Sequence, residues 1–268
     1  MEYFDYYLIH AVDDDRWTNV ANPFGVYEKL IKYKEEGRIH NLGFSFHGTN
    51  SCLKQMIQEF KWDFVQIQLN YFDWIYQDAK TSYNLLHDAG IPIIVMEPVR
   101  GGALARLCPK AIQLLNDNDH QGTPASLALR FVASLDGVQT VLSGMSSKEQ
   151  LEDNLRTFSD FKPLSDEEMK LVEKIRNAYL ESGSIPCTEC RYCQPCPKGV
   201  LIPEIFSIYN KYVQNQDIEQ FRKDFFAIKE EHSPQSCIKC GKCEQICPHS
   251  IEITKKLSDI AYFASLHR

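Results

Sequence analysis

The chain has 268 residues, of which 44% are hydrophobic, so it is long enough for a sizeable core and about two domains. It contains no run of about 18 apolar residues that could span a membrane, and its N-terminus lacks the basic and apolar regions of a signal peptide, so we expect a cytoplasmic protein with no membrane partner. The formal net charge is −7, and without a basic region for a phosphate backbone we expect no nucleic-acid partner.

Residues 1–160 alternate between short apolar runs and longer segments with helical periodicity. The short runs predict five strands at Tyr3–Ile9, Ile39–Ser45, Phe64–Leu69, Ile91–Met96 and Val138–Leu142. The longer segments predict helices at Phe24–Glu36, Cys52–Glu59, Ala79–Ala89 and Pro124–Ser134. This alternation is typical of an α/β fold of βα units around a parallel sheet. Because a closed (β/α) barrel needs eight strands, five strands indicate a partial barrel or an open sheet with exposed edges.

The rest of the chain predicts one helix, a linker and a mostly helical region. Ser165 and Glu168 have the spacing of a capping box, which predicts a helix from there to about Tyr179. Residues 181–186 have the composition of a linker. Beyond it, helical patterns cover Pro203–Val213, Ile218–Ile228 and Ile253–Leu266. We therefore divide the chain into a partial barrel at 1–160, a helix and linker at 161–185, and a cysteine-containing domain at 186–268.

Eight of the ten cysteines lie in two motifs with nearly the same spacing. The second motif has the spacing C-x2-C-x2-C-x3-C-P and comprises Cys237, Cys240, Cys243 and Cys247. The first has its last gap shortened by one residue and comprises Cys187, Cys190, Cys193 and Cys196. The full spacing is that of bacterial ferredoxins. We therefore expect these eight cysteines to bind two [4Fe–4S] clusters.

The expected pairing of cysteines follows from the ferredoxin run, in which three closely spaced thiolates hold one cubane and the fourth reaches the other cluster. One cluster is then expected on Cys187, Cys190, Cys193 and Cys247, and the other on Cys237, Cys240, Cys243 and Cys196. Zinc is an alternative, but a zinc ribbon needs two C-x2-C pairs, without a third and fourth cysteine followed by proline. Disulfides are disfavoured in a reducing cytosol. Cys52 and Cys108 have no partners in the sequence and are expected to be ordinary thiols.

Segments of the first 160 residues resemble, in order, the later strands of the aldo/keto reductase barrel. Its fourth to seventh strands are similar to Tyr3–His10, Gly37–Ser45, Gln66–Tyr71 and Ile91–Pro98, the last followed by Gly101-Gly102. The last helix and the eighth strand are similar to Pro124–Arg130 and Val141–Gly144. With its cysteine motifs, the chain resembles the aldo/keto reductases that carry a C-terminal ferredoxin domain. The resemblance implies a TIM-type barrel and NAD(P)H-dependent reduction of a carbonyl.

The same resemblance implies roles for residues at the carboxyl ends of strands, where such barrels carry their chemistry. His10 would orient and polarise the substrate carbonyl, while Ser45 and Gln68 would hold the nicotinamide carboxamide. Met96 stands where the family often places a tyrosine that stacks on the nicotinamide, so that contact is altered. Taken without the family, His10 is more often a structural histidine, and Ser45 and Gln68 are ordinary polar residues at strand ends.

The resemblance also locates the far end of the nicotinamide cofactor. Asn154 matches the position that contacts adenine. Gln150 stands where many members carry an arginine for the 2′-phosphate of NADPH, and a neutral amide lacks the charge of that contact. This departure weakens the case for NADP over NAD.

The first three βα units of the family have no counterpart in the sequence. In the family they carry the catalytic tyrosine, which donates the proton, and its aspartate and lysine partners. Tyr3, Tyr6 and Tyr7 lie inside the segment that resembles the fourth strand and cannot replace it. The chain thus resembles the C-terminal part of a longer reductase. Without the general acid, about 10²- to 10⁴-fold of proton-transfer assistance is lost, so we expect little or no carbonyl reductase activity from the chain as written.

Three functions are consistent with these features. The first is an iron–sulfur oxidoreductase that couples NAD(P)H to electron transfer through two [4Fe–4S] clusters, with a carbonyl or quinone-like substrate and a redox partner protein. The second is an electron-transfer and cluster-binding module for which the partial barrel is only a platform. The third is a fragment that needs its missing segment from elsewhere. An in-frame aspartate, tyrosine and lysine encoded upstream of Met1 would favour the first.

Overall fold

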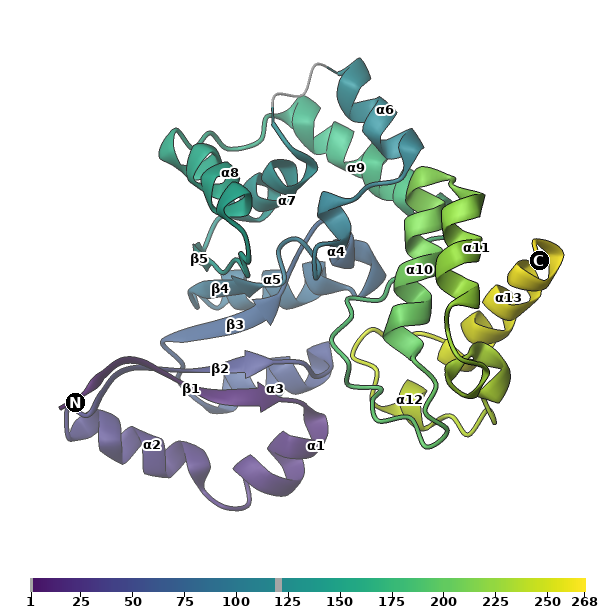
Figure 1. Ribbon diagram of the computed structural model, residues 1–268. Helices are drawn as coiled ribbons and strands as arrows, with labels where there is room; N and C mark the ends of the chain where they lie inside the picture. Colours follow the sequence, from purple (N-terminus) through teal and green to yellow (C-terminus); the bar gives the residue numbers. More distant parts are fainter. Residues whose placement is uncertain (1, 119–121) are drawn as a thin grey trace. The chain divides into compact units, whose positions relative to one another are not determined.

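A computed structural model describes residues 2–118 and 122–268, and these fold into two compact units (Figure 1). The sheet unit comprises residues 1–99 and 125–169, and the cysteine unit comprises residues 100–124 and 170–268. Residues 100–124, which the sequence places in the barrel domain, belong to the cysteine unit. Among the described residues, no helix is both long enough and apolar enough to cross a bilayer.

The sheet unit is built on a parallel sheet of five strands whose spatial order follows the chain. The strands are β1 (Phe4–Val12), β2 (Ile39–Phe46), β3 (Phe64–Gln68), β4 (Ile93–Met96) and β5 (Val138–Val141). All five strands predicted from the apolar runs are therefore confirmed. The register places Ser45 opposite Gln66 and Gln68 opposite Met96. Because the strands are parallel, their carboxyl ends meet at one edge of the sheet.

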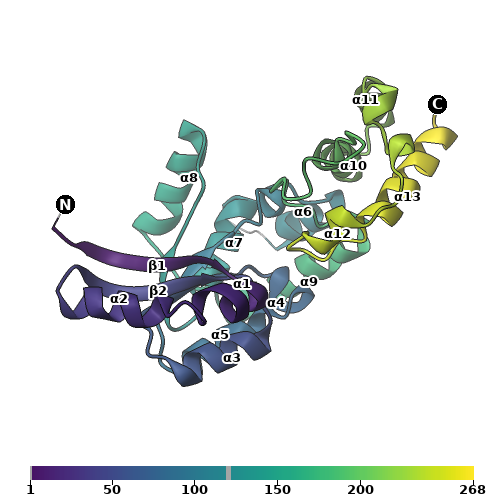
Figure 2. The same ribbon diagram turned by 90° about the horizontal axis from the view of Figure 1, so that it is seen from below.

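Helices connect these strands, as expected for βα units. The sheet unit contains α1 (Asp14–Arg16), the π-helix η1 (Trp17–Ala21), α2 (Val26–Glu35), α3 (Asn50–Glu59), α4 (Asp73–Tyr76), α5 (Ala79–Asp88), α7 (Pro124–Ala133) and α8 (Lys148–Ser159). Figure 2 shows α2, α3 and α5 on the same face of the sheet. Gly37 and Gly90 follow the ends of α2 and α5 with φ angles of 75° and 67°, which glycine adopts without a Cβ clash.

The core of the sheet unit lies between the sheet and the helices that cover it. Phe44, Val65 and Ile67 from the strands are almost completely buried. Leu53 from α3 and Leu86 from α5 are completely buried on the helix side. Burial of such side chains stabilises the fold by about 25 cal/mol per Å² of apolar surface removed from water.

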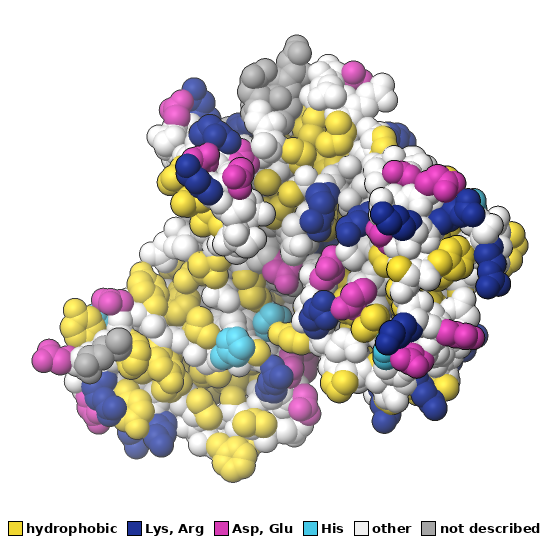
Figure 3. Space-filling model, in the orientation of Figure 1, with side chains coloured by type: hydrophobic (Ala, Val, Ile, Leu, Met, Phe, Trp, Pro, Cys, Tyr) yellow, Lys and Arg dark blue, Asp and Glu magenta, His cyan; other side chains and the backbone are white. Residues whose placement is uncertain are grey.

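Both edges of the sheet are open within the part of the chain that the structure describes. β1 has β2 as its strand neighbour and β5 has β4, so each edge presents backbone groups that a further strand could pair with. The aromatic side chains of β1 are partly exposed, Tyr6 by 50% and Tyr7 by 38%. Figure 3 shows hydrophobic side chains gathered over the region of these strands. The expected partial barrel is thus present as a sheet that does not close.

The cysteine unit is mostly helical. It contains η2 (Ala103–Ala105), α6 (Pro109–Asp117), most of α9 (Asp166–Glu181), α10 (Ile202–Asn215), α11 (Ile218–Phe226), η3 (Glu230–His232), η4 (Pro234–Ser236), α12 (Lys242–Gln245) and α13 (Ile253–Leu266). The predicted helices α10, α11 and α13 are confirmed, whereas α6 was not predicted. The capping box of α9 is present, because Glu168 N–H donates to Ser165 Oγ and Ser165 N–H donates to the Glu168 carboxylate.

A separate apolar core holds the cysteine unit together. Its centre is formed by completely or almost completely buried side chains from the linker and from α10 and α13, including Ile185, Ile205, Phe206, Leu257 and Ile260. Six cysteines of the two motifs pack against this core: Cys187, Cys193, Cys196, Cys237, Cys243 and Cys247. The core therefore fixes where the thiols stand.

Candidate functional site

The two cysteine motifs form loops with the same backbone conformation. In the first loop, Glu189 and Arg191 have positive φ angles of 56° and 65°. In the second, Lys239 and Gly241 stand at the equivalent positions with φ angles of 54° and 72°. Non-glycine residues adopt this region at a cost of about 1–3 kcal/mol, so the shape of the first loop is imposed by its surroundings. Backbone N–H groups in such turns form concave anion sites, which many iron–sulfur proteins use.

A backbone amide points at a sulfur atom in each loop. Glu189 N–H donates to Cys187 Sγ at 3.4 Å, and Lys239 N–H donates to Cys237 Sγ at 3.4 Å. Such a hydrogen bond stabilises the charged form of the sulfur and helps to set the potential of a bound cluster. The sequence repeat is therefore also a structural repeat.

The repeat continues after the last cysteine of each motif. Gly199 N–H donates to the Cys196 carbonyl at 2.9 Å, and Ser250 N–H donates to the Cys247 carbonyl at 3.1 Å. Both donors have positive φ angles, 67° and 48°. After this turn the first motif leads into α10 and the second into α13.

The shortened gap of the first motif is accommodated by a glutamine side chain. In the second motif the short helix α12 occupies the wider gap before Cys247. In the first, Gln194 Nε2 donates to the Val200 carbonyl at 2.9 Å, and its Oε1 accepts from Cys196 N–H at 3.0 Å. Gln194 thus holds Cys196 at the end of its loop.

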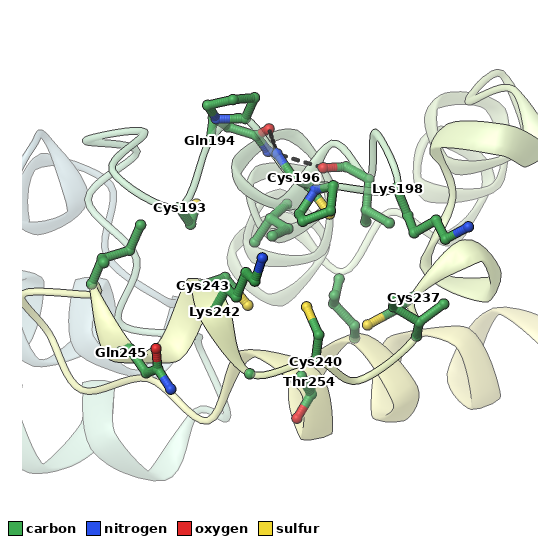
Figure 4. Close-up of a pocket in the computed structure, with 18 residues that line it drawn as sticks. Cys193, Gln194, Cys196, Lys198, Cys237, Cys240, Lys242, Cys243, Gln245 and Thr254 are labelled. Atoms are coloured by element: carbon green, nitrogen blue, oxygen red, sulfur yellow. Dashed lines mark hydrogen bonds between the residues drawn. The ribbon is translucent and has the colours of Figure 1, made fainter.

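Residues of both motifs surround a cavity of about 480 Å³, drawn in Figure 4. The cysteines that line it are Cys193, Cys196, Cys237, Cys240 and Cys243. Lys198 and Lys242 also line it, and none of the described lining residues is acidic. The volume lies within the range of about 300–1,000 Å³ that is usual for ligand and cofactor sites. Thiols and ammonium groups without carboxylates suit an anionic iron–sulfur cluster.

A smaller cavity brings the remaining cysteines together. Its cysteines are Cys187, Cys190, Cys193 and Cys247. It measures about 20 Å³, roughly the space of one water molecule, so these side chains would have to open outward to admit a cubane. The two cavities divide the cysteines as the expected pairing does, except that Cys193 lines both.

Burial affects the acidity of three of these thiols. It raises the pKa of Cys187 and Cys243 to about 11 and that of Cys193 to about 12, because the neutral thiol is favoured away from water. Negative charge on neighbouring thiolates and carboxylates raises these pKa values further. Without iron these thiols are therefore protonated at neutral pH. Since iron binds thiolate, loading of the site releases protons.

A tight single-ion site is a different arrangement from these cavities. Among residues 2–118 and 122–268, no three His, Cys, Asp or Glu side chains converge closely enough to hold one metal ion. The cysteines of the two motifs are instead spread around the walls of the two cavities.

The sheet unit gathers polar residues at the carboxyl ends of β1 and β2. His10 is exposed near the end of β1, and Ser45 is buried near the end of β2. Ser45 Oγ accepts a hydrogen bond from Ala11 N–H at 2.7 Å, which joins the two strand ends. The pKa of His47 is lowered, first by burial and then by the positive charges of His10 and Arg16. His10, Ser45 and His47 therefore share one region of the strand ends.

Gln68, at the end of β3, belongs to a buried polar cluster. Its Nε2 donates to Asp73 Oδ2 at 2.7 Å and to Gln77 Oε1 at 3.0 Å. Asn70 Nδ2 donates to the same oxygen of Asp73 at 2.7 Å, and both Asn70 and Asp73 are completely buried. No role for Asp73 followed from the sequence alone. An acidic residue shortly after a buried strand was the signal that could have revealed it.

The residues expected at the adenine end of the cofactor lie on α8. Asn154 Nδ2 donates to Ser143 Oγ at 2.8 Å. Gln150 Oε1 accepts from Ser146 N–H at 2.7 Å and from Ser147 N–H at 3.3 Å, and Gln150 N–H donates to Ser147 Oγ. The Gln150 oxygen is thus engaged in a capping box at the start of α8, a helix that the sequence analysis did not predict.

Comparison with known families identifies both regions of the chain. The model of the aldo/keto reductase family matches residues 1–177. The chain belongs to the aldo/keto reductase family. The model of the 4Fe-4S dicluster domain matches residues 186–252, which include all eight cysteines of the two motifs. The resemblance noted in the sequence is thereby confirmed, and the C-terminal region is a ferredoxin-type iron–sulfur domain.

Solved aldo/keto reductase structures share the fold of this family member. AKR11C1 from Bacillus halodurans matches 65% of the chain at 24% identity, with a TM-score of 0.52 in its holo form and 0.53 in its apo form. The thermostable aldo-keto reductase Tm1743, in complex with the inhibitor epalrestat, matches 65% of the chain at 22% identity with a TM-score of 0.52. The chain spans 59% to 62% of the length of these structures. No curated protein matches the chain in sequence.

The residues expected to act in this member of the aldo/keto reductase family fall into two groups. His10, Ser45 and Gln68 lie at or near the carboxyl ends of neighbouring strands, and Gln150 and Asn154 lie on α8. Met96 ends β4, where its Sδ accepts a hydrogen bond from Gln66 Nε2 at 3.3 Å. The cofactor roles of these residues remain predictions.

Proposed function

We propose that this chain is an iron–sulfur oxidoreductase of the aldo/keto reductase type, which couples NAD(P)H to electron transfer through two [4Fe–4S] clusters. The observation that carries the proposal is the distribution of eight cysteines around two cavities. One cluster is assigned to Cys187, Cys190, Cys193 and Cys247, and the other to Cys237, Cys240, Cys243 and Cys196. Bound clusters would supply one-electron carriers beside a two-electron hydride donor.

Three features support clusters over zinc. Eight thiols stand where a zinc ribbon would use four. The two loops share left-handed residues and amide-to-sulfur hydrogen bonds at equivalent positions. The larger cavity exceeds the space that a single tetrahedral ion needs, because zinc–sulfur bonds measure only about 2.3 Å.

The cluster assignment is tested by anaerobic reconstitution of the full chain with iron and sulfide. We expect a broad absorbance band at about 400 nm and about eight irons per chain. Iron near zero together with stoichiometric zinc in the purified protein would contradict the assignment.

We further propose that the nicotinamide site is only partly present in this chain. His10 would polarise the carbonyl, Ser45 and Gln68 would hold the carboxamide, and Gln150 and Asn154 would meet the adenosine end. The sequence offers no counterpart of the family's tyrosine, aspartate and lysine, and the described residues form five strands where a closed barrel has eight. We therefore expect NAD(P)H to bind this partial site less tightly than it would bind a site built on eight strands.

Activity measurements test this second proposal. We expect NAD(P)H oxidation near background with a panel of aldehydes and quinones, because the general acid is absent. Turnover at ordinary enzymatic rates of about 1–10³ s⁻¹ would contradict it.

The open sheet edges favour one alternative, an electron-transfer module without reductase activity. In that case the chain would bind clusters but not the nicotinamide cofactor. Titration of the reconstituted chain with NADH and NADPH separates the two functions. Saturable binding that weakens in Ser45→Ala and Gln68→Ala favours the oxidoreductase, and no binding to a chain with full iron content favours the module.

A redox partner protein would meet the larger cavity at its exposed apolar rim. Ile238 and Ile246 line this cavity and are 58% and 54% exposed. Lys198 and Lys242 give the rim a positive charge, which suits an acidic cytoplasmic partner rather than nucleic acid or membrane. We expect Lys242→Glu to slow electron exchange with an acidic redox protein at low salt, and the difference to vanish at high salt.

A further inference from the structure

Arg100 is a buried cation of the cysteine unit that lies outside both cysteine motifs. Its side chain has no exposed surface. A buried charge is costly unless hydrogen bonds and charges compensate it, so the groups that it contacts indicate what it does. An arginine keeps its charge at all relevant pH values.

The guanidinium of Arg100 bridges two segments that carry cysteines of the smaller cavity. Its Nη1 donates to the carbonyl of Pro186, the residue directly before Cys187, at 2.9 Å. Its Nη2 lies 3.5 Å from Nδ1 of His249, two residues after Cys247. Because a guanidinium carries only donors, Nδ1 of the histidine accepts in this contact.

His249 extends this bridge back to the first motif. Its Nε2 lies 2.7 Å from Oγ1 of Thr188, and its side chain lines the smaller cavity. The residue after Arg100 is also in close contact with the same loop, since a Cβ on Gly101 would lie 2.7 Å from the Thr188 carbonyl oxygen. Arg100, His249 and Thr188 are all buried, so this network stands away from water.

The equivalent positions around the larger cavity are open. By the repeat, Lys198 of the first motif corresponds to His249, and Ile238 of the second corresponds to Thr188. Lys198 is exposed, and Ile238 is 58% exposed. The Arg100 network is therefore placed to act on one of the two sites.

We propose that Arg100 is a positioning residue for the cluster assigned to Cys187, Cys190, Cys193 and Cys247, which it serves by joining the two ligand-bearing segments and by placing one positive charge beside that site. The inference rests on the proposed two-cluster function. A positive charge in a low-dielectric region favours the more negative, reduced state of a nearby cluster. Removal of the charge therefore lowers the reduction potential of that cluster.

The test is a redox titration of the reconstituted full chain, followed by electron paramagnetic resonance. Cys190→Ser first identifies which signal belongs to the cluster beside Arg100. In Arg100→Gln we expect the reduction potential of this signal to fall by at least about 59 mV, which is a tenfold change in the one-electron equilibrium. The other signal should not move. Arg100→Lys should shift the potential of this signal much less, because lysine keeps the positive charge. Arg222→Gln, at a position on α11 where the side chain is 42% exposed, is the matched control and moves neither signal.

Loss of the assigned signal alone from Arg100→Gln, with about four irons remaining, supports the proposal equally well. The proposal is overturned by equal shifts of both signals, by no shift, by loss of both clusters, or by an Arg100→Lys variant as defective as Arg100→Gln. Iron near zero in the unsubstituted chain would reject the clusters themselves, so the two failures are distinguishable.

Discussion

The cysteine unit and the sheet unit differ in how much of a site each contains. In the cysteine unit, two short motifs supply eight thiols, and one compact core holds six of them in place. In the sheet unit, the polar residues stand at the ends of parallel strands. The two edge strands of this sheet, β1 and β5, each pair with one described strand, and Tyr6 on β1 is half exposed.

This difference follows from the range of the interactions that build each region. A cysteine loop is formed by about ten consecutive residues, and its shape is set by local turns and amide-to-sulfur bonds. A barrel closes only when strands far apart in the sequence pair, so a region with five strands has a defined sheet but an open rim.

The largest expected effect concerns the crossed pairing of the cysteine unit. Cys196→Ser should remove the same cluster as Cys240→Ser, although Cys196 belongs to the other motif in sequence. Each variant should keep about four of about eight irons. Cys52→Ser, which replaces a buried cysteine outside the motifs, is the control and should keep all of them. If Cys196→Ser instead gave the spectrum of Cys190→Ser, the pairing would be sequential and not crossed.

The second effect tests whether the sheet unit has a rigid interior despite its open edges. Asp73→Ala removes the buried oxygen that accepts hydrogen bonds from Gln68 and Asn70. The free energy of unfolding, measured with urea, should fall by about 3 kcal/mol, because these donors lose their acceptor. Asp88→Ala, at an 81% exposed position on α5, should change stability by less than about 0.5 kcal/mol. Equal effects of the two substitutions would mean that the polar cluster does not hold this region.

The third effect compares a buried thiol of the sheet unit with an exposed thiol of the cysteine unit in the iron-free chain. Burial raises the pKa of Cys52 from 9.0 to about 11, so its thiolate fraction at pH 8 is about 100-fold lower than that of an ordinary thiol. Alkylation of Cys52, followed by mass spectrometry, should be slow at pH 8 and accelerate as the pH approaches 11. Folding favours the neutral thiol, so its share of stability is present below pH 9 and is lost as the pH rises through about 11. Labelling as fast as that of exposed Cys190 would contradict this.

The smallest effect compares two glycines with equal space around them. A Cβ at either Gly241 or Gly144 would have no atom within 4 Å, but Gly241 has a φ of 72° and Gly144 does not lie in this region. Gly241→Ala should therefore destabilise the cysteine unit by about 1 kcal/mol, whereas Gly144→Ala in the sheet unit should be neutral or slightly stabilising. Thermal unfolding of the two variants side by side measures the difference.

Much of the fold was predictable because its elements carry strong local patterns. All five strands followed from short apolar runs, and α9 followed from the capping box of Ser165 and Glu168. The helices α6 and α8 were missed. Both begin after irregular segments, and α8 has no fully buried residue, although the capping box of Ser147 and Gln150 marks its start.

The candidate sites were predictable to different degrees. Cysteine spacing marked the eight thiols because a cubane demands that ligand geometry. Gln150 was assigned from its place in the chain, but its side chain proves to cap α8, and only the folded backbone could reveal that. Arg100 and His249 gave no signal, since a single arginine or histidine in sequence does not say what it will contact.

By itself, the sequence determined the parallel strands and the family and indicated eight candidate ligands, because apolar periodicity and cysteine spacing act over a few residues. The tertiary structure alone decided which cysteines share a cavity, that Asp73 holds Gln68, and that Arg100 joins Pro186 to His249. Such contacts arise between segments that meet only when the core packs. The physical reason is that burial in the core fixes side chains from distant segments in one arrangement, which local patterns do not specify.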